Sequence, residues 1–265
     1  MNPATVLLLG AGRMGGAMIE GWAVGGPVGL DGLLIRDPHP GPEALAAAKE
    51  GAVLNPPDHE LRRAGTVVLA VKPQMWREVA EAVAPHLAPN AVIVSVAAGV
   101  SIGSLAEVFG ARDIARVMPT TAVAICQGAA SIFAYSEDAR DRAQDLFASI
   151  AETIDLEDED LMHAATAVSG SGPAYFYAFV EALEDAGIRA GLPERAAILM
   201  AQATVTGAAA LMASGDMSPP DLRAQVTSPG GTTEAALKVL MGAGGLGALL
   251  DEAVAAAVRR SKELG

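Results

Sequence analysis

The chain has 265 residues, a net charge of −13 and one cysteine, Cys126. The negative charge repels polyanions and no long run of Lys or Arg offsets it, so we expect no nucleic-acid partner. One cysteine forms neither an intramolecular disulfide nor a thiolate metal site, and we expect no metal. The opening MNPATVLLLGAG has no charged segment before its short apolar run, which predicts neither a signal peptide nor a membrane span. We therefore expect a cytoplasmic protein with no membrane partner.

Short apolar runs alternate with helical stretches along the first half of the chain. The runs that we expect to be strands buried on both faces are residues 6–9, 33–35, 67–71 and 92–96. Each of these runs is followed by a stretch whose apolar residues have helical spacing. These predicted helices are 14–22, 42–50, 74–84 and 102–109. Such alternation predicts a parallel, doubly wound sheet. Further runs at 114–117, 131–135 and 153–156 extend that sheet, with a helix at 138–150 between the last two.

The pattern changes at about residue 158, beyond which nothing alternates like a strand. Apolar residues three and four apart predict helices at 158–167, 172–190, 194–213, 218–225, 231–241 and 245–263. The fold class is therefore α/β, with a Rossmann-type doubly wound parallel sheet in residues 1–157 and an all-α domain in 158–265. The segment 196–213 is rich in Ala and poor in charge, so it predicts the interface of a homodimer.

The first turn of the chain fits the G-x-G-x-x-G pattern of dinucleotide-binding sites. Its residues are Gly10, Ala11, Gly12, Arg13, Met14 and Gly15, placed between a predicted strand and a predicted helix. The first glycine permits a tight turn, the second lets a pyrophosphate approach the backbone, and the third lets the helix pack on the strand. The alternative is a glycine-rich turn with no ligand.

The end of the second strand leaves the choice of dinucleotide open. Asp37 lies at the right distance along the chain to bond the ribose 2′-hydroxyl of NAD, whereas Arg36 suits the 2′-phosphate of NADP. Each could instead be a solvated loop charge. Because the two residues act in opposite directions, we predict a modest preference for NADPH, with NADH also used.

Few residues could handle the proton of a hydroxyl substrate. None of the histidines at 39, 59, 86 and 163 has a clear carboxylate partner in the sequence, and only His163, near the domain junction, stays open as a candidate. The glycine-rich segment 169–173 lacks the lysine that a hydroxyacid dehydrogenase of similar layout carries there. An iminium substrate needs no such group, because its nitrogen can arrive already protonated.

Two segments rich in glycine and hydroxyl groups precede predicted helices. They are SGSGP at 169–173 and TSPGGTT at 227–233. Free N–H groups and hydroxyls at such helix starts suit a carboxylate. Ordinary helix N-caps are the alternative, since Ser, Thr and Gly are favoured there in any case.

Over nearly its whole length the sequence resembles the pyrroline-5-carboxylate reductase family. The motifs that carry the resemblance are GAGRMG at 10–15, AVKPQ at 70–74, SVAAGV at 95–100, SGSGPAY at 169–175 and TSPGGTT at 227–233, of which the last two are specific to the family. The resemblance implies NAD(P)H-dependent reduction of 1-pyrroline-5-carboxylate to L-proline, the last step of proline biosynthesis. It also implies a homodimer with interleaved helical domains, often assembled further.

The resemblance also implies roles for individual residues. Lys72 and Ala98 would line the nicotinamide pocket, within cofactor-binding segments that include Ala70, Val71, Pro73 and Ala97. Thr166 and Ser171 would approach the nicotinamide and the substrate from the helical domain. The substrate would be held by Gln225, Gly231, Thr232 and Thr233, with Thr233 close to the ring nitrogen. Thr233, Ser171 and Lys72 are thus the expected catalytic residues.

The chain departs from the usual family pattern at three places. It has Thr120 and Ala122 where the family usually has Asn and Pro, which changes a loop expected to meet the cofactor. Arg13 replaces a common Asn and adds a cation near the pyrophosphate, and Gln225 stands where some members have Asn. Two rival functions remain at this point: a two-domain hydroxyacid dehydrogenase, and a nucleotide-sensing protein that has lost turnover.

Overall fold

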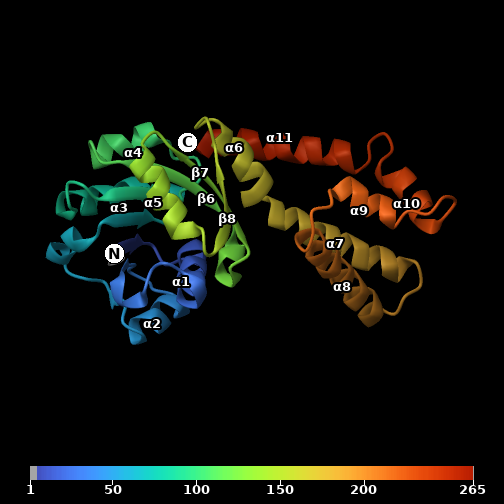
Figure 1. Cartoon of the computed structure of the whole chain (residues 1–265), viewed down its shortest axis with the longest axis horizontal. Coiled ribbons are helices and arrows are strands. Elements are labelled where there is room, and N and C mark those ends of the chain that lie inside the picture. The colour runs from blue at the N-terminus through green and yellow to red at the C-terminus, as the bar shows by residue number, and fades with distance from the viewer. Residues whose placement is uncertain (1–4, 265) are drawn as a thin grey trace. The chain divides into compact units, whose positions relative to one another are not determined.

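The computed structural model describes residues 5–264, which form two compact units (Figure 1). The first unit is Met1–Gly170 together with Ala257–Gly265, and the second is Ser171–Ala256. The last strand ends at Asp155, close to the expected boundary at 157, but the first compact unit extends to Gly170. The change in secondary structure and the division into compact units therefore fall at different residues.

Within the described part of the first unit the strands form one eight-stranded sheet, in the order β3-β2-β1-β4-β5-β6-β7-β8. The strands are β1 (Val6–Leu9), β2 (Leu33–Arg36), β3 (Val53–Leu54), β4 (Thr66–Leu69), β5 (Val92–Ser95), β6 (Ile114–Pro119), β7 (Gly128–Ala134) and β8 (Ala151–Asp155). The first six are parallel to one another, as the alternation of strands and helices predicts. The two-residue β3 has no counterpart among the predicted strands.

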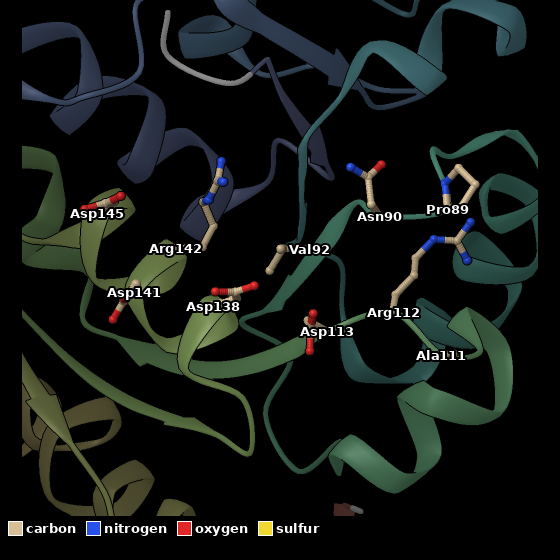
Figure 2. Close-up of a pocket in the computed structure, with 10 residues that line it drawn as sticks. All are labelled: Pro89, Asn90, Val92, Ala111, Arg112, Asp113, Asp138, Asp141, Arg142 and Asp145. Atoms are coloured by element: carbon tan, nitrogen blue, oxygen red, sulfur yellow. The ribbon is translucent and has the colours of Figure 1, made fainter. Parts of the chain in front are cut away.

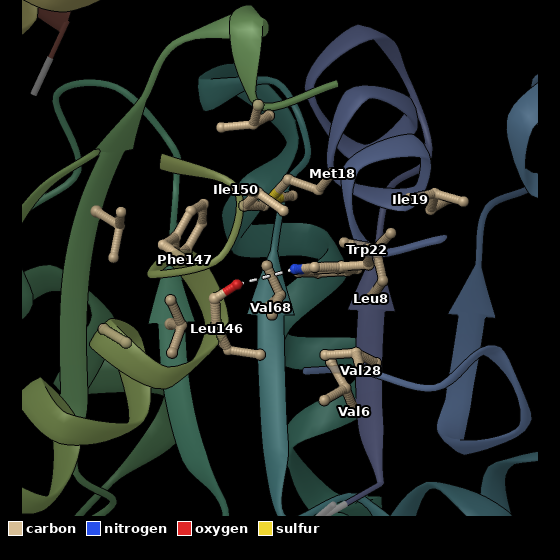
Figure 3. Packing of buried hydrophobic residues seen from close by; sticks show 14 of the residues in the cluster. Val6, Leu8, Met18, Ile19, Trp22, Val28, Val68, Leu146, Phe147 and Ile150 are labelled. Atoms are coloured by element: carbon tan, nitrogen blue, oxygen red, sulfur yellow. Dashed lines mark hydrogen bonds between the residues drawn. The ribbon is translucent and has the colours of Figure 1, made fainter. Parts of the chain in front are cut away.

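Helices cover both faces of this sheet. They are α1 (Arg13–Gly25), α2 (Pro42–Lys49), α3 (Trp76–Val83), α4 (Ile102–Phe109) and α5 (Glu137–Phe147), joined by the 3-10 turns η1 (Leu30–Gly32), η2 (Asp58–Arg63), η3 (Pro73–Met75) and η4 (Ala84–His86). Leu8 packs with α1, α2 and α5 on one face, while Leu7 packs with α3 and α4 on the other. Figure 3 shows the first of these layers, where the indole N–H of Trp22 donates to the carbonyl of Leu146 at 2.9 Å. Both faces of the central strands are therefore buried, which explains why their sequences are apolar throughout.

The sheet departs from the predicted parallel arrangement only between β6 and β7, among the described strands. β7 runs antiparallel to β6, and β8 is parallel to β7. The connection from β6 to β7 spans only residues 120–127 and holds the 3-10 turn η5 (Thr121–Ile125). A parallel return needs a crossover of about a dozen residues or more, so this short connection requires an antiparallel pair.

A π-helical turn directly precedes the helix predicted to begin at residue 172. Helix α6 (Leu161–Ala165) continues into the π-helical η6 (Thr166–Gly170), and α7 begins at Gly172. The hydroxyl of Ser169 donates to the carbonyl of Ala165 at 2.8 Å, and that of Thr166 to Met162 at 2.7 Å. These two hydroxyls are therefore already hydrogen-bonded within their own helical segment.

The second unit is helical, as predicted. Its helices are α7 (Gly172–Arg189), α8 (Glu194–Ala213), α9 (Pro219–Gln225), α10 (Thr232–Leu240) and α11 (Leu246–Leu264), the last turns of which belong to the first unit. By length and composition α8 is apolar enough to cross a membrane, and only 11% of its apolar window is buried within this chain. Leu199, Met200 and Leu211 of α8 are each more than half exposed. The unit therefore presents a large apolar surface that the chain itself does not cover.

Candidate active site

The glycine-rich turn joins β1 to α1, and its glycines meet different steric demands. Gly10 has a φ of +92°, and a methyl group there would also meet Val71 and the carbonyl of Ala70. A methyl group on Gly15 would overlap the carbonyl of Gly10, which brings α1 close to β1. A methyl group on Gly12 would meet nothing within 4 Å among the described residues. Gly10 thus permits the tight turn, Gly12 leaves the backbone open to a ligand, and Gly15 allows the helix to pack closely on the strand, as the motif predicts.

The N-terminus of α1 is suited to an anionic group. Gly12 is its N-cap and receives no side-chain capping bond, and the first turn holds no acidic residue. Arg13 is exposed at the first helical position. N–H groups, helix dipole and guanidinium together favour a diphosphate at this point.

Asp37 is bonded to the glycine-rich turn. Its Oδ2 accepts the backbone N–H of Ala11 at 2.6 Å, and its Oδ1 accepts that of His39 at 2.7 Å. The side chain of Asn55, whose φ is +49°, pairs with the backbone N–H and carbonyl of Asp37, both at 3.0 Å. Asn55 escaped the sequence analysis, although an Asn followed by Pro56 and Pro57 is typical of a loop with special backbone geometry.

Arg36 does not stand free at the end of β2. Its Nη1 lies 2.7 Å from Oδ1 of Asp58, the first residue of η2. The neighbouring guanidinium lowers the pKa of Asp58 below its ordinary value. Both candidate ribose residues are thus placed beside the turn, and each is already engaged within the chain.

The segments after β4 and β5 lie along the same edge of the sheet as the glycine-rich turn. Ala70 donates its N–H to Leu9 at 2.8 Å, and Val96 donates to Leu69 at 3.0 Å. Lys72 is exposed immediately before η3, where Pro73 is the first residue. Ala97 is buried and Ala98 half-buried beyond the end of β5. The structure therefore brings 10–15, 36–37, 70–73 and 97–98 together at the carboxyl ends of parallel strands, where open α/β sheets bind ligands.

Thr120 has a clear role despite its departure from the family pattern. Its backbone N–H donates to the carbonyl of Ala129 at 2.9 Å, and its hydroxyl accepts the N–H of Ala129 at 3.1 Å. The residue is buried. A threonine at this position therefore closes the connection between β6 and β7.

A buried ion pair joins β6 to the segment that follows β8, and the sequence did not predict it. Arg116, 5% exposed, contacts Glu159 at 2.8 Å, and the same carboxylate oxygen accepts the N–H of Ile102 at 2.7 Å, in the first turn of α4. Arg116 and Glu159 are 43 residues apart, so no local pattern pairs them.

His163, left open by the sequence, contacts Ser261 of α11 through Nδ1 at 2.9 Å. Burial, and then the nearby charge of Arg116, lower the pKa of His163 and favour its neutral form. Its observed contact is with the last turns of α11, which is a structural role.

In the second unit, the loop before α10 ends in an uncapped helix start. Gly231 is the N-cap and receives no side-chain capping bond, so Thr232 and Thr233 occupy the first turn. Gly230, with a φ of +73°, donates its N–H to the carboxylate of Glu234 at 2.6 Å. That contact shows that the loop presents an N–H group to a carboxylate. Thr233 is not the cap of α10, which disfavours the alternative that its hydroxyl only caps a helix.

The remaining predicted residues are divided between the units. Gln225 ends α9 in the second unit, exposed, with its amide 3.0 Å from the sulfur of Met217. Ser171 directly precedes α7 and makes no side-chain capping bond. Thr166 lies in η6 of the first unit, which also holds the segments 10–15, 36–37, 70–73 and 97–98. π-helical turns often mark functional positions, which fits the role expected for Thr166.

A hollow of about 620 Å³ lies at the opposite edge of the sheet (Figure 2). It is lined by residues around the starts of β5, β6 and α5, which are Pro89, Asn90, Val92, Ala111, Arg112, Asp113, Asp138, Asp141, Arg142 and Asp145. The guanidinium of Arg112 donates to the carbonyls of Ala84, Leu87, Ala88 and Phe109. The N–H groups of Arg112 are therefore bonded to backbone carbonyls of the same chain. The hollow lies at the amino ends of the strands, away from the carboxyl ends where the glycine-rich turn lies.

Comparisons with known proteins agree with this geometry. A family model described as pyrroline-5-carboxylate reductase dimerisation matches residues 159–264, and one described as NADP oxidoreductase, coenzyme F420-dependent, matches residues 5–99. Pyrroline-5-carboxylate reductase from Pseudomonas aeruginosa is 38% identical over 271 residues, covering 100% of this chain and 98% of that protein. The corresponding protein of Pisum sativum is 36% identical, with 98% of this chain and 96% of that protein covered.

Solved structures give the same result. A pyrroline-5-carboxylate reductase from Coxiella burnetii has a TM-score of 0.89 at 32% identity, covering 100% of this chain and 99% of that chain. The pyrroline carboxylate reductase of Plasmodium falciparum, solved with NADP bound, has a TM-score of 0.85 at 27% identity, with the same coverage. The chain belongs to the pyrroline-5-carboxylate reductase family.

Proposed function

We propose that this protein reduces 1-pyrroline-5-carboxylate to L-proline with a hydride from NAD(P)H. The observation that carries the proposal is the full-length similarity to reductases of this substrate, at 38% identity for the Pseudomonas aeruginosa protein. The dinucleotide-binding edge supports it, because the open approach at Gly12 and the uncapped start of α1 fit a pyrophosphate. The cofactor supplies the hydride, and the chain supplies binding, orientation and protection from water.

The carboxylate of the substrate is proposed to bind at the start of α10. The N–H groups of Thr232 and Thr233 lie at a helix N-terminus without a side-chain cap, whereas that of Gly231 donates to the carbonyl of Ser228 at 3.0 Å and would have to leave it to bind a ligand. The loop already holds the carboxylate of Glu234 on the N–H of Gly230. In an acidic protein, backbone dipoles supply the local positive potential that a carboxylate needs. Gln225, at the other end of the loop, is proposed as a further substrate contact.

Three side chains are proposed to act at the reacting atoms. The hydroxyl of Thr233 orients the protonated ring nitrogen, and Ser171 and Lys72 line the space around the substrate and the nicotinamide, with Thr166 beside them. Because the iminium carries its proton on arrival, these groups position it and need not abstract a proton. The residues come from both units, and a homodimer would complete one site with residues of two chains.

We propose a homodimer formed through the second unit, with assembly of dimers into larger oligomers and a location in the cytoplasm. The exposed apolar residues of α8 favour it, among them Leu199, Met200 and Leu211 at 58%, 57% and 66% exposure. The dimerisation model covers this helix. A second copy therefore accounts for the apolar surface of α8 better than a membrane does.

One assay separates this function from its rivals. NAD(P)H absorbance is followed with 1-pyrroline-5-carboxylate and, separately, with a panel of hydroxyacids and keto acids. Oxidation of the cofactor with the pyrroline alone is the expected result. Turnover of a hydroxyacid or keto acid would identify a dehydrogenase, and NADPH binding without any turnover would identify a nucleotide sensor.

A further inference from the structure

Asp58 neutralises the one cation that β2 places at the nucleotide-binding edge. Nη1 of Arg36 lies 2.7 Å from Oδ1 of Asp58, and this nitrogen is shielded from solvent. The other carboxylate oxygen of Asp58 faces Nε2 of His86 at 3.6 Å. As whole side chains Arg36 is 36% exposed and Asp58 is 49% exposed, so both border solvent although Nη1 itself does not.

The pair lies where the adenosine ribose of a dinucleotide belongs. The carbonyl of Arg36 accepts the N–H of Gly10 at 2.9 Å, and the next residue, Asp37, holds the N–H of Ala11. In a Rossmann-type fold the end of the second strand beside the glycine-rich turn faces the ribose, and a guanidinium there receives the 2′-phosphate of NADP.

We propose that Asp58 is a specificity-determining residue, because it competes with the 2′-phosphate of NADPH for the guanidinium of Arg36. This inference rests on the proposed function. A 2′-phosphate must share Arg36 with a carboxylate of like charge or displace it, whereas the 2′-hydroxyl of NADH makes no such demand. Asp58 therefore moderates the preference for NADPH that Arg36 would otherwise confer.

Asp58 can compete for Arg36 only while its carboxylate is charged. Arg36, with smaller contributions from His86 and His59, lowers the pKa of Asp58, so the carboxylate is charged throughout the neutral range.

The experiment compares D58N, R36A, the double variant and a control, E60Q. Glu60 lies on the same turn as Asp58 but pairs with Arg63 at 2.9 Å, so E60Q removes an equal charge without freeing Arg36. The dissociation constants of adenosine 2′,5′-bisphosphate and adenosine 5′-monophosphate are measured by calorimetry, after thermal unfolding has confirmed that each variant folds. The ratio of kcat/KM for NADPH over NADH is measured in parallel.

D58N is expected to raise the preference for the bisphosphate over the monophosphate at least fivefold, on the order of 1 kcal/mol, and to raise the NADPH to NADH ratio in the same direction. The gain should vanish in the R36A background and be absent in E60Q. An unchanged preference in D58N, an equal gain in E60Q, or a gain that survives R36A would overturn the proposal. The nucleotide measurements contain no pyrroline, so a failure of imine reduction would leave this test intact.

Discussion

The carboxylate of Asp37 accepts the backbone N–H of Ala11 at 2.6 Å, and this bond ties the end of β2 to the glycine-rich turn 26 residues earlier. A residue whose sequence position indicates a ribose contact thus also holds the turn at which we propose the pyrophosphate binds. The ribose contact and the hold on the turn can be distinguished by experiment, because they affect the binding of NADH and NADPH differently.

Replacing Asp37 with Ala is expected to weaken NADPH by about tenfold, because a hydrogen bond to a charged group contributes about 1.5–3 kcal/mol to holding the turn, and to weaken NADH more, because NADH also loses its ribose contact. Fluorescence titration of each cofactor measures the effect. If Asp37 served the ribose alone, NADH would weaken while NADPH tightened, since a carboxylate repels the 2′-phosphate.

The glycines at 12 and 15 offer a matched pair of alanine substitutions. Gly15→Ala places a methyl group against the carbonyl of Gly10, so we expect a loss of stability of about 1–3 kcal/mol. Gly12→Ala meets no described atom within 4 Å, so the fold should persist while the cofactor dissociation constant rises at least tenfold. Urea unfolding and cofactor titration of both variants are the measurements. Equal cofactor affinity in Gly12→Ala and the unmodified protein would place the pyrophosphate elsewhere.

Thr233→Val tests the proposed substrate site. Since Thr233 does not cap α10, its loss should leave thermal unfolding and cofactor affinity nearly unchanged. We expect kcat/KM for 1-pyrroline-5-carboxylate to fall at least tenfold, a barrier increase of about 1.4 kcal/mol. Retention of full kcat/KM would remove the hydroxyl from the site and leave the backbone N–H groups of Thr232 and Thr233 as the candidate carboxylate contacts.

The homodimer is tested by charging its proposed interface. Leu199→Glu on α8 should shift the protein from dimer to monomer and abolish most activity, because a buried, unpaired carboxylate opposes association. Val24→Glu is the control, as Val24 is 78% exposed on α1 in the first unit. Sedimentation velocity at assay concentration gives the mass of each form. An unmodified protein that is active as a monomer would contradict the proposed assembly.

The buried pair of Arg116 and Glu159 should matter far more than a surface pair. Glu159→Ala leaves a guanidinium that is 5% exposed without its carboxylate, and we expect a loss of about 3 kcal/mol or more. Glu107→Ala breaks the exposed pair with Arg77 and should cost less than about 1 kcal/mol. Chemical unfolding of both variants under one set of conditions makes the comparison. If both variants lost the same small amount of unfolding free energy, groups other than Glu159 would have to stabilise the charge of Arg116.

Several features could be predicted because they depend on local periodicity and on residue type. Most strands and helices follow from the alternation of buried apolar runs with helical spacing, and the different roles of Gly10, Gly12 and Gly15 follow from their place between β1 and α1. The family motifs at 169–175 and 227–233 pointed to the correct family. The helix start at residue 172 was predicted, whereas the π-helical turn over Thr166–Gly170 was not.

Only the tertiary structure decided which charged groups face one another. Arg36 meets Asp58, Asp37 meets the turn at Ala11, and Arg116 meets Glu159, each across a separation in sequence that no periodic pattern spans. Such pairs form because folding brings strand residues such as Arg36 and Arg116 next to segments distant in sequence, where buried or partly buried charges need partners. For that reason the sequence identified Arg36 and Asp37 as opposing influences on the cofactor, while the counter-charge on Arg36 emerged only when the chain was folded.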